Sequence, residues 1–116
     1  MQKTAVADSL PTMLIKLGLC SELDVALAFV ESGSFSKITS EQYPLEKILP
    51  DDISLRFLKH YHLIGLSADE LSVTVSMLDP EDDFVLDALR LAMGKTIVPQ
   101  VGVLSEIDAA IAVQYE

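Results

Sequence analysis

The chain has 116 residues, of which 50% are hydrophobic, and its formal net charge is −10. This length suits one compact domain, or one domain with a short helical piece attached, and the apolar fraction allows a packed core. Acidic residues concentrate after residue 50, where 12 Asp and Glu stand against 4 Lys and Arg. Because such a surface repels phosphate groups, we expect neither nucleic acid binding nor direct association with anionic lipid.

The sequence also carries no targeting signal that we recognise. No apolar run approaches the roughly 20 residues that span a bilayer, so we expect no membrane insertion. The N-terminal residues Met1-Gln2-Lys3-Thr4 lack the apolar core of a signal peptide. The single cysteine, Cys20, cannot form an internal disulfide. Together these features predict a cytoplasmic location.

Residues 1–33 are predicted to form a helical hairpin. Apolar residues recur at i, i+3, i+4 and i+7 in two runs, which Gly18 and Gly33 close, and Ser21 is the expected N-cap of the second helix. The stripes are Leu10, Met13, Leu14 and Leu17, then Leu23, Ala26, Leu27 and Val30. Two helices this short cannot bury both stripes alone. They are expected to pack on the rest of the chain, on a partner, or on a second copy.

Residues 34–50 are predicted to be a linker because Ser, Thr and Pro punctuate them, with one short turn at Leu45–Leu49. Residues 51–116 then show an α+β pattern. A short helix that includes Leu55 and Leu58 precedes a strand at 63–66, and residues 71–77 alternate between apolar and polar side chains.

The last third of the pattern is a helix, a strand and a second helix. Asp79-Pro80 is predicted to begin the first helix, with Asp79 as N-cap, and Gly94 to end it. Thr96–Val101 is predicted to be a strand, and its Pro99 indicates either an edge position or a bulge. Ser105 is predicted to open the final helix. The expected fold is α+β: an N-terminal helical hairpin followed by a small three-stranded sheet packed by helices.

The order of these features resembles the N-terminal domain of the general secretion pathway protein E family, the ATPases of type II secretion. The matching stretches are 55–63 (LRFLKHYHL), the strand 71–77 followed by Asp79-Pro80, residues 87–94, and 105–111 (SEIDAAI). The loop 17–22 also resembles the family, whereas the linker matches poorly. The resemblance implies a domain without catalytic chemistry that docks the ATPase onto the cytoplasmic domain of the inner-membrane platform protein L. It would then lie at the inner membrane through that partner.

Catalytic and metal chemistry have little support in the sequence. Gly94-Lys95-Thr96 matches the end of a phosphate-binding Gly-x-x-x-x-Gly-Lys-Ser/Thr loop, but Leu89 replaces the first glycine. His60 and His62 lack further zinc ligands nearby, and the acidic run 79–83 is typical of a helix N-terminus. We therefore assign no catalytic, cofactor-binding or metal-binding residue. We expect the ATPase core to lie elsewhere in a full-length chain and to be a partner of this domain.

One segment stands out as a candidate partner-binding surface. The basic and aromatic residues Arg56, Phe57, Lys59, His60 and Tyr61 form the only such cluster in an otherwise acidic domain. An ordinary helix with a buried Phe57 and solvated Arg56 and Lys59 explains them equally well. The hairpin is the second candidate surface, through which a homo-oligomer would also bury the two stripes.

The alternative function is sensing of cyclic di-GMP. Related N-terminal domains of secretion and pilus ATPases bind this dinucleotide through an Arg-Leu-Gly opening on the first helix and a Gln that ends the second. In this chain the opening falls at Ser9-Leu10-Pro11 and the glutamine position at Val30. The arginine, glycine and glutamine are all absent, and with them the charged anchor for a phosphate.

Overall fold

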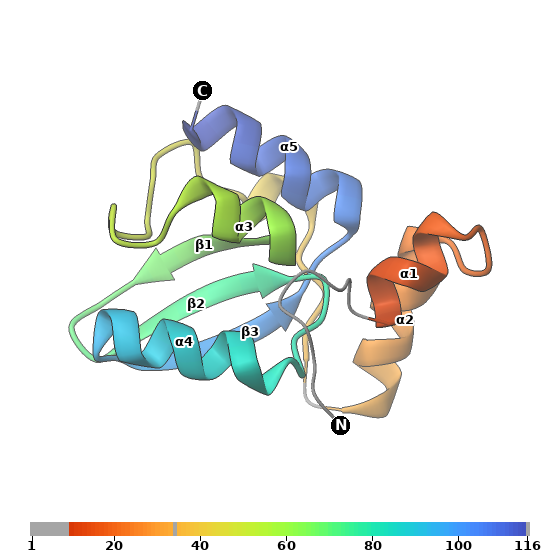
Figure 1. Cartoon of the computed structure of the whole chain (residues 1–116), viewed down its shortest axis with the longest axis horizontal. Coiled ribbons are helices and arrows are strands. Elements are labelled where there is room, and N and C mark those ends of the chain that lie inside the picture. The colour runs from red at the N-terminus through yellow and green to blue at the C-terminus, as the bar shows by residue number, and fades with distance from the viewer. Residues whose placement is uncertain (1–9, 34, 116) are drawn as a thin grey trace.

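The structure is a computed structural model that describes residues 10–33 and 35–115. Figure 1 shows a helical hairpin projecting from one side of a body in which helices pack against a sheet. The class is α+β, as predicted. In chain order the elements are α1 (Leu10–Lys16), α2 (Glu22–Ser32), the 3-10 helix η1 (Ser40–Gln42), α3 (Leu55–Tyr61), β1 (Leu63–Ala68), β2 (Ser72–Met77), α4 (Asp83–Met93), β3 (Thr96–Val101) and α5 (Leu104–Tyr115).

The three strands form one mixed sheet in the order β1-β2-β3. β1 and β2 are antiparallel, with a bulge between Gly65 and Ser67, and β2 and β3 are parallel, with α4 as the connection between them. The alternation that predicted β2 is confirmed, because Val73, Val75 and Met77 are all buried. The largest fully buried side chains include Leu58, Leu63, Ile64, Leu89, Ile107 and Ile111, which come from helices and strands of the body.

β3 lies at an edge of the sheet, which is one of the two possibilities that Pro99 indicated, and its pairing with β2 has no bulge. The Val101 N–H points outward and donates to Ser36 O at 3.1 Å, whereas the Thr96 N–H points inward to Leu71 O at 3.0 Å. Pro99, two residues before Val101, faces the same outward direction and has no N–H to offer. The open edge therefore lacks a donor at the position where another strand would otherwise bind.

Residues 35–50 lie against the body and do not run free of it. Ile38 donates its N–H to Val101 O at 2.9 Å, and Ile38 and Leu49 are both buried. The helical turn in this segment is η1, several residues ahead of the predicted turn at Leu45–Leu49. The division into a hairpin, a linker and a subdomain stays a prediction about domain organisation.

Two predicted helix starts are wrong by a few residues, for local reasons. The Asp79 carboxylate accepts the N–H of Glu81 at 3.1 Å and closes a turn, so α4 begins only at Asp83, with Asp82 as its N-cap. α5 begins at Leu104 instead of being opened by Ser105. Gly94 does end α4, in the left-handed conformation with φ of 65° that favours glycine.

The hairpin forms as predicted, but most of its apolar stripe residues are exposed. Ser21 is the N-cap of α2 and accepts the N–H of Asp24, as expected. α2 packs through Val25 and Ala26, which are buried, whereas its neighbours Leu23 and Leu27 are exposed. Leu10 and Met13 of α1 and Leu17, directly after it, are exposed as well. The hairpin therefore presents a broad apolar surface that the described part of the chain leaves uncovered.

Candidate partner-binding surface

The predicted cluster lies on α3, a helix of two turns with well-defined ends. Ser54 is its N-cap and accepts the N–H of Phe57 at 3.1 Å. At the other end His62 adopts a left-handed conformation, with φ of 54°, and turns the chain directly into β1. Leu58 is fully buried and anchors the helix, so Arg56 and Lys59 are exposed.

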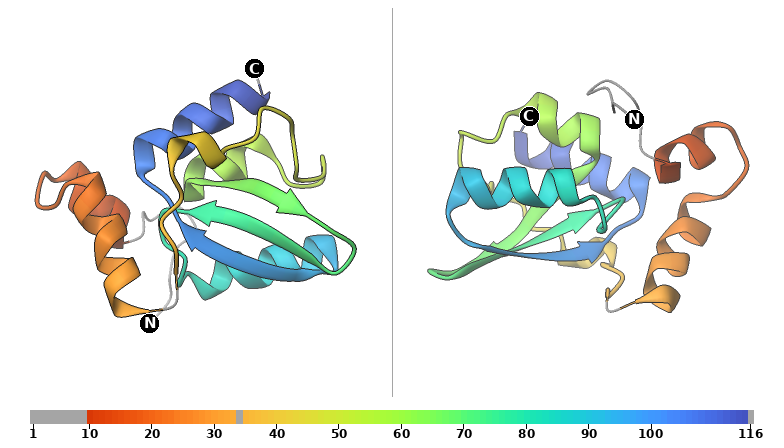
Figure 2. Two further views of the ribbon diagram at one scale, coloured as in Figure 1. Left: turned by 180° about the vertical axis from the view of Figure 1, so that it is seen from behind. Right: turned by 60° about the horizontal axis from the view of Figure 1, so that its bottom comes forward.

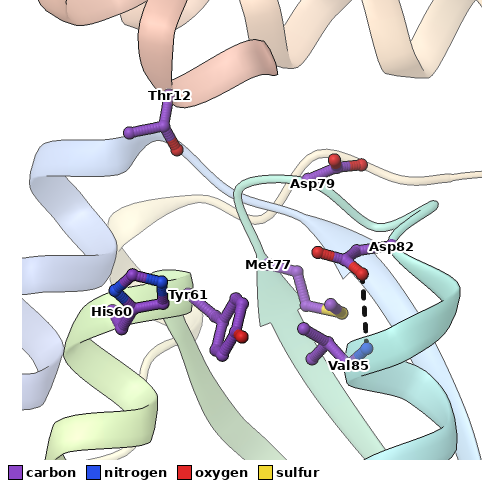
Figure 3. A pocket seen from close by; sticks show the side chains of 7 residues that line it. All are labelled: Thr12, His60, Tyr61, Met77, Asp79, Asp82 and Val85. Carbon is purple, nitrogen blue, oxygen red and sulfur yellow. Dashed lines mark hydrogen bonds between the residues drawn. The ribbon is translucent and has the colours of Figure 1, made fainter. Parts of the chain in front are cut away.

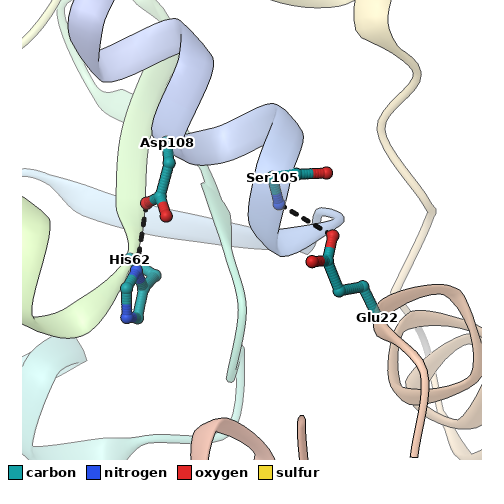
Figure 4. Close-up of polar contacts among 4 residues, drawn as sticks. All are labelled: Glu22, His62, Ser105 and Asp108. Atoms are coloured by element: carbon teal, nitrogen blue, oxygen red, sulfur yellow. Dashed lines mark hydrogen bonds and ion pairs between the residues drawn. The ribbon is translucent and has the colours of Figure 1, made fainter. Parts of the chain in front are cut away.

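His62 is held by a contact with α5. Its Nδ1 lies 3.0 Å from Asp108 Oδ1, as Figure 4 shows. A left-handed conformation is strained for a residue other than glycine, so this contact helps to fix the end of α3. The position of the cluster relative to the rest of the body is thereby set from two sides.

The aromatic members of the cluster reach across to α4. The ring centroids of Phe57 and Tyr61 are 4.9 Å apart, and those of His60 and Tyr61 are 4.6 Å apart. The ring of Tyr61 also lies 6.0 Å from that of Phe84, which is 60% exposed. We call Arg56, Phe57, Lys59, His60, Tyr61 and Phe84 the α3–α4 surface. Aromatic rings at such distances stabilise one another while presenting a large apolar area.

The sequence did not single out Phe84. It stands in the acidic first turn of α4, among residues that read as helix capping and solvated surface. The available signal was its size: a large aromatic side chain is unusual among charged residues at a helix start. Only the fold shows that it meets Tyr61, which lies 23 positions earlier in the sequence.

A small cavity separates the α3–α4 surface from the hairpin. Thr12, His60, Tyr61, Asp79 and Asp82 are among its lining residues, and Figure 3 shows Thr12 of α1 across from His60. The Asp82 carboxylate is engaged as the N-cap of α4 and accepts the Val85 N–H at 3.3 Å. The surface therefore has basic groups on its α3 side and carboxylates on its α4 side.

The hairpin meets the body at a second point. Glu22, in the first turn of α2, accepts the Ser105 N–H at 3.0 Å and so caps the N-terminus of α5 (Figure 4). Ala26, one turn further along α2, is completely buried next to Val101 and Val103. Leu10 and Met13 of α1 remain exposed, whereas the buried Thr12 of α1 lines the cavity next to the α3–α4 surface.

Several features that suggested other chemistry have structural explanations. Lys95 of the Gly94-Lys95-Thr96 stretch donates from Nζ to Asp69 O at 2.7 Å, next to the turn between β1 and β2. Within residues 10–33 and 35–115, no three His, Cys, Asp or Glu side chains come close enough together to hold a metal ion. Cys20 is a half-buried free thiol. In the same residues no helix has the length and hydropathy needed to cross a membrane.

The fold and this surface define a small α+β module whose exposed chemistry suits binding. The MshEN domain family matches residues 35–115. Type II secretion system protein E of Xanthomonas campestris pv. campestris is 39% identical over 101 residues, which cover 83% of this chain and 18% of that protein. The chain therefore belongs to the MshEN domain family, and it is an N-terminal domain of the type II secretion protein E group.

Solved structures agree with this assignment. The N-terminal domain of XpsE superposes in two crystal forms, with TM-scores of 0.83 and 0.84 at 35% and 32% identity. These matches cover 92% and 98% of this chain, and 75% and 81% of the XpsE chains. The structure of MshE with cdg has a TM-score of 0.63 at 16% identity, covering 92% of this chain and 78% of that one. At that identity the likeness concerns the fold alone.

Proposed function

We propose that this domain docks a type II secretion ATPase onto the cytoplasmic domain of the inner-membrane platform protein L and so couples the ATPase to protein secretion. In this proposal the domain works at the cytoplasmic side of the inner membrane and has no catalytic site of its own. ATP hydrolysis belongs to the ATPase core of a longer protein, of which the chain spans a small part.

The observation that carries the proposal is the α3–α4 surface. Phe84 is an exposed aromatic residue supported by Tyr61. Arg56 and Lys59, on the same helix as Tyr61, are exposed and basic in a chain with a net charge of −10. Aromatic residues and arginine are enriched at the energetic centres of protein interfaces. The exposed apolar residues of α1, Leu10 and Met13, provide further area for a partner to bury.

NMR mapping tests the location of the interface. Unlabelled cytoplasmic domain of the cognate protein L is added to the ¹⁵N-labelled chain, and we expect amide shifts to concentrate at 56–61 and 84 and on α1. Arg56→Glu should weaken the complex roughly threefold or more, because it reverses a charge at the interface. Arg90→Glu makes the same charge change on an exposed part of α4 away from Phe84 and should have little effect. Equal weakening by the two variants would place the interface elsewhere.

A cyclic di-GMP sensor is the second candidate, because the hairpin meets the body at a cavity where a ligand would connect the two. The charges at this cavity argue against it. Asp79 and Asp82 line the cavity, and carboxylates repel phosphates. Among the residues that the structure describes, no Lys or Arg lines it. Calorimetric titration with cyclic di-GMP decides between them: saturable heat with the dinucleotide and none with protein L would replace the docking proposal.

A further inference from the structure

A second recess lies on the other face of the body. It runs between residues 40–45 and α5, and Figure 2 (left) shows these two segments side by side on the side that is hidden in Figure 1. Pro44, Leu45, Ala109 and Val113 provide its apolar walls. Leu45 is 78% exposed and Val113 is 56% exposed, so the rim is open to solvent. We call this recess the α5 groove.

One carboxylate lines this mostly apolar groove, together with the hydroxyl-bearing residues Ser40 and Tyr43. Glu106 Oε1 is buried and has no hydrogen-bond partner, although Glu106 as a whole keeps some exposure. Tyr43, also in the groove, has its hydroxyl 2.9 Å from Ser76 Oγ, and the two are hydrogen-bonded to each other. Burial raises the pKa of Tyr43, and the negative charge of Glu106 raises it further. Glu106 thus places a buried carboxylate oxygen without a hydrogen-bond partner against an apolar wall.

Other buried side-chain oxygens on α5 also lack a hydrogen-bond partner. In the described part of the chain, the buried side-chain oxygens without a partner belong to Glu106, Gln114 and Tyr115, all on α5. Gln114 donates from Nε2 to Pro44 O at 3.0 Å, but its Oε1 has no donor. Buried polar atoms are nearly always hydrogen-bonded in folded proteins, so such a group calls for a specific explanation.

Helix capping does not supply that explanation. An acidic residue in the first turn is favoured by the helix dipole, which accounts for the presence of Glu106 near the start of α5. The Ser105 N–H at that end is already capped by Glu22 of α2. The dipole also gives no reason for the carboxylate to lie against the apolar wall of a groove.

We propose that the α5 groove binds a lysine or arginine side chain of a partner polypeptide. The apolar stem would lie along Pro44, Leu45 and Val113, and the cationic head would meet Glu106. Long basic side chains bind in this way because their methylene stems are apolar while their heads need a charged partner. A second copy of this chain fits poorly, because both copies would carry a net charge of −10 and repel each other. The site lies apart from the α3–α4 surface and does not depend on the docking proposal.

The test uses n-butylguanidinium, a guanidinium head on a four-carbon stem that corresponds to an arginine side chain together with its Cα. It is titrated into the ¹⁵N-labelled domain at constant ionic strength. We expect saturable shifts of the Ala109, Ala110 and Val113 amides. Guanidinium alone and n-butanol alone, which carry only the head or only the stem, should each bind about tenfold more weakly. A dilution series without any probe should leave these amides unshifted.

Two groove variants and one matched control make the test specific. Glu106→Gln should weaken binding about tenfold, and Leu45→Ala, which alters an exposed side chain, roughly threefold. Glu41→Gln removes the same charge from an exposed residue of η1 and should change nothing. Unchanged binding by both Glu106→Gln and Leu45→Ala would overturn the proposal, as would guanidinium binding as tightly as n-butylguanidinium. Concentration-dependent shifts without probe would assign the groove to a second copy and overturn it equally.

Discussion

Replacing Gly102 by alanine should destabilise the domain strongly, although its backbone conformation does not require glycine. A Cβ at this position would lie 2.2 Å from Ser76 Oγ, 2.5 Å from the Tyr43 hydroxyl and 3.0 Å from Ile107 Cδ1. Ser76 is completely buried, so it has no free space to move into. The added methyl group must therefore displace at least one side chain and break the hydrogen bond between Tyr43 and Ser76.

The magnitude follows from those contacts. Overpacking a close-packed site costs about 1–3 kcal/mol, and loss of the hydrogen bond adds about 1 kcal/mol, so unfolding should become easier by about 2–4 kcal/mol. For 116 residues this corresponds to a fall in Tm of about 8–16 °C. Urea denaturation followed by circular dichroism measures the free energy, and a thermal scan measures Tm.

A control and a rescue make this prediction specific. At Gly33 an added Cβ meets nothing closer than 3.6 Å, so Gly33→Ala should cost about 1 kcal/mol or less. Ser76→Ala removes the closest atom, so Gly102→Ala should cost about 1 kcal/mol less in that background than alone. The steric account is refuted if Gly102→Ala destabilises no more than Gly33→Ala, or if the two substitutions at 76 and 102 are simply additive.

Three further predictions concern stability. The backbone N–H groups of Leu71 and Ser72 donate to the Asp69 carboxylate and lower its pKa in the folded protein. The ionised carboxylate therefore stabilises the fold fully above the unfolded pKa, about 3.9, and this stabilisation is lost as the pH falls through the lower folded pKa. Asp69→Asn should flatten that acid loss in urea titrations, and an unchanged pH profile would contradict this. Ser54→Ala should cost about 1 kcal/mol by removing the N-cap of α3, and no loss in urea midpoint would mean that water replaces the cap. Leu89→Ala, in the core, should cost about 2–5 kcal/mol, whereas Leu91→Ala, at an 87% exposed position, should stay within about 0.5 kcal/mol.

The parts of the fold that the sequence predicted are those with local causes. β2 and β3 appear within a residue of their predicted bounds, because alternation and Pro99 act along a single strand. Gly18 and Gly94 end helices in the left-handed conformation, which few other residues adopt easily. The start of α4 was missed because Asp79 and Asp82 are equally good caps in sequence, and only the folded turn decides which one is used.

The parts that escaped prediction depend on contacts between distant segments. The α3–α4 surface depends on the contact between Phe84 and Tyr61, which are far apart in the sequence. The close packing at Gly102 depends likewise on Tyr43 and Ser76, which come from separate segments. Periodicity predicted the two helices of the hairpin and, through Ala26, part of the buried face of α2. It did not predict that Val25 is buried while Leu23 and Leu27 are exposed. A sequence pattern shows which residues share a face, but it does not show which face the body covers.

The docking proposal is tested most directly by calorimetric titration of the chain with the cytoplasmic domain of its cognate platform protein L. We predict saturable heat for the unaltered chain and at least about tenfold weaker binding for Phe84→Ala, because an exposed aromatic residue at the centre of an interface carries much of its energy. Leu71→Ala, which shortens an 80% exposed side chain in the turn between β1 and β2, should bind normally. No heat with the unaltered chain, or equal affinities for the two variants, would contradict docking through the α3–α4 surface.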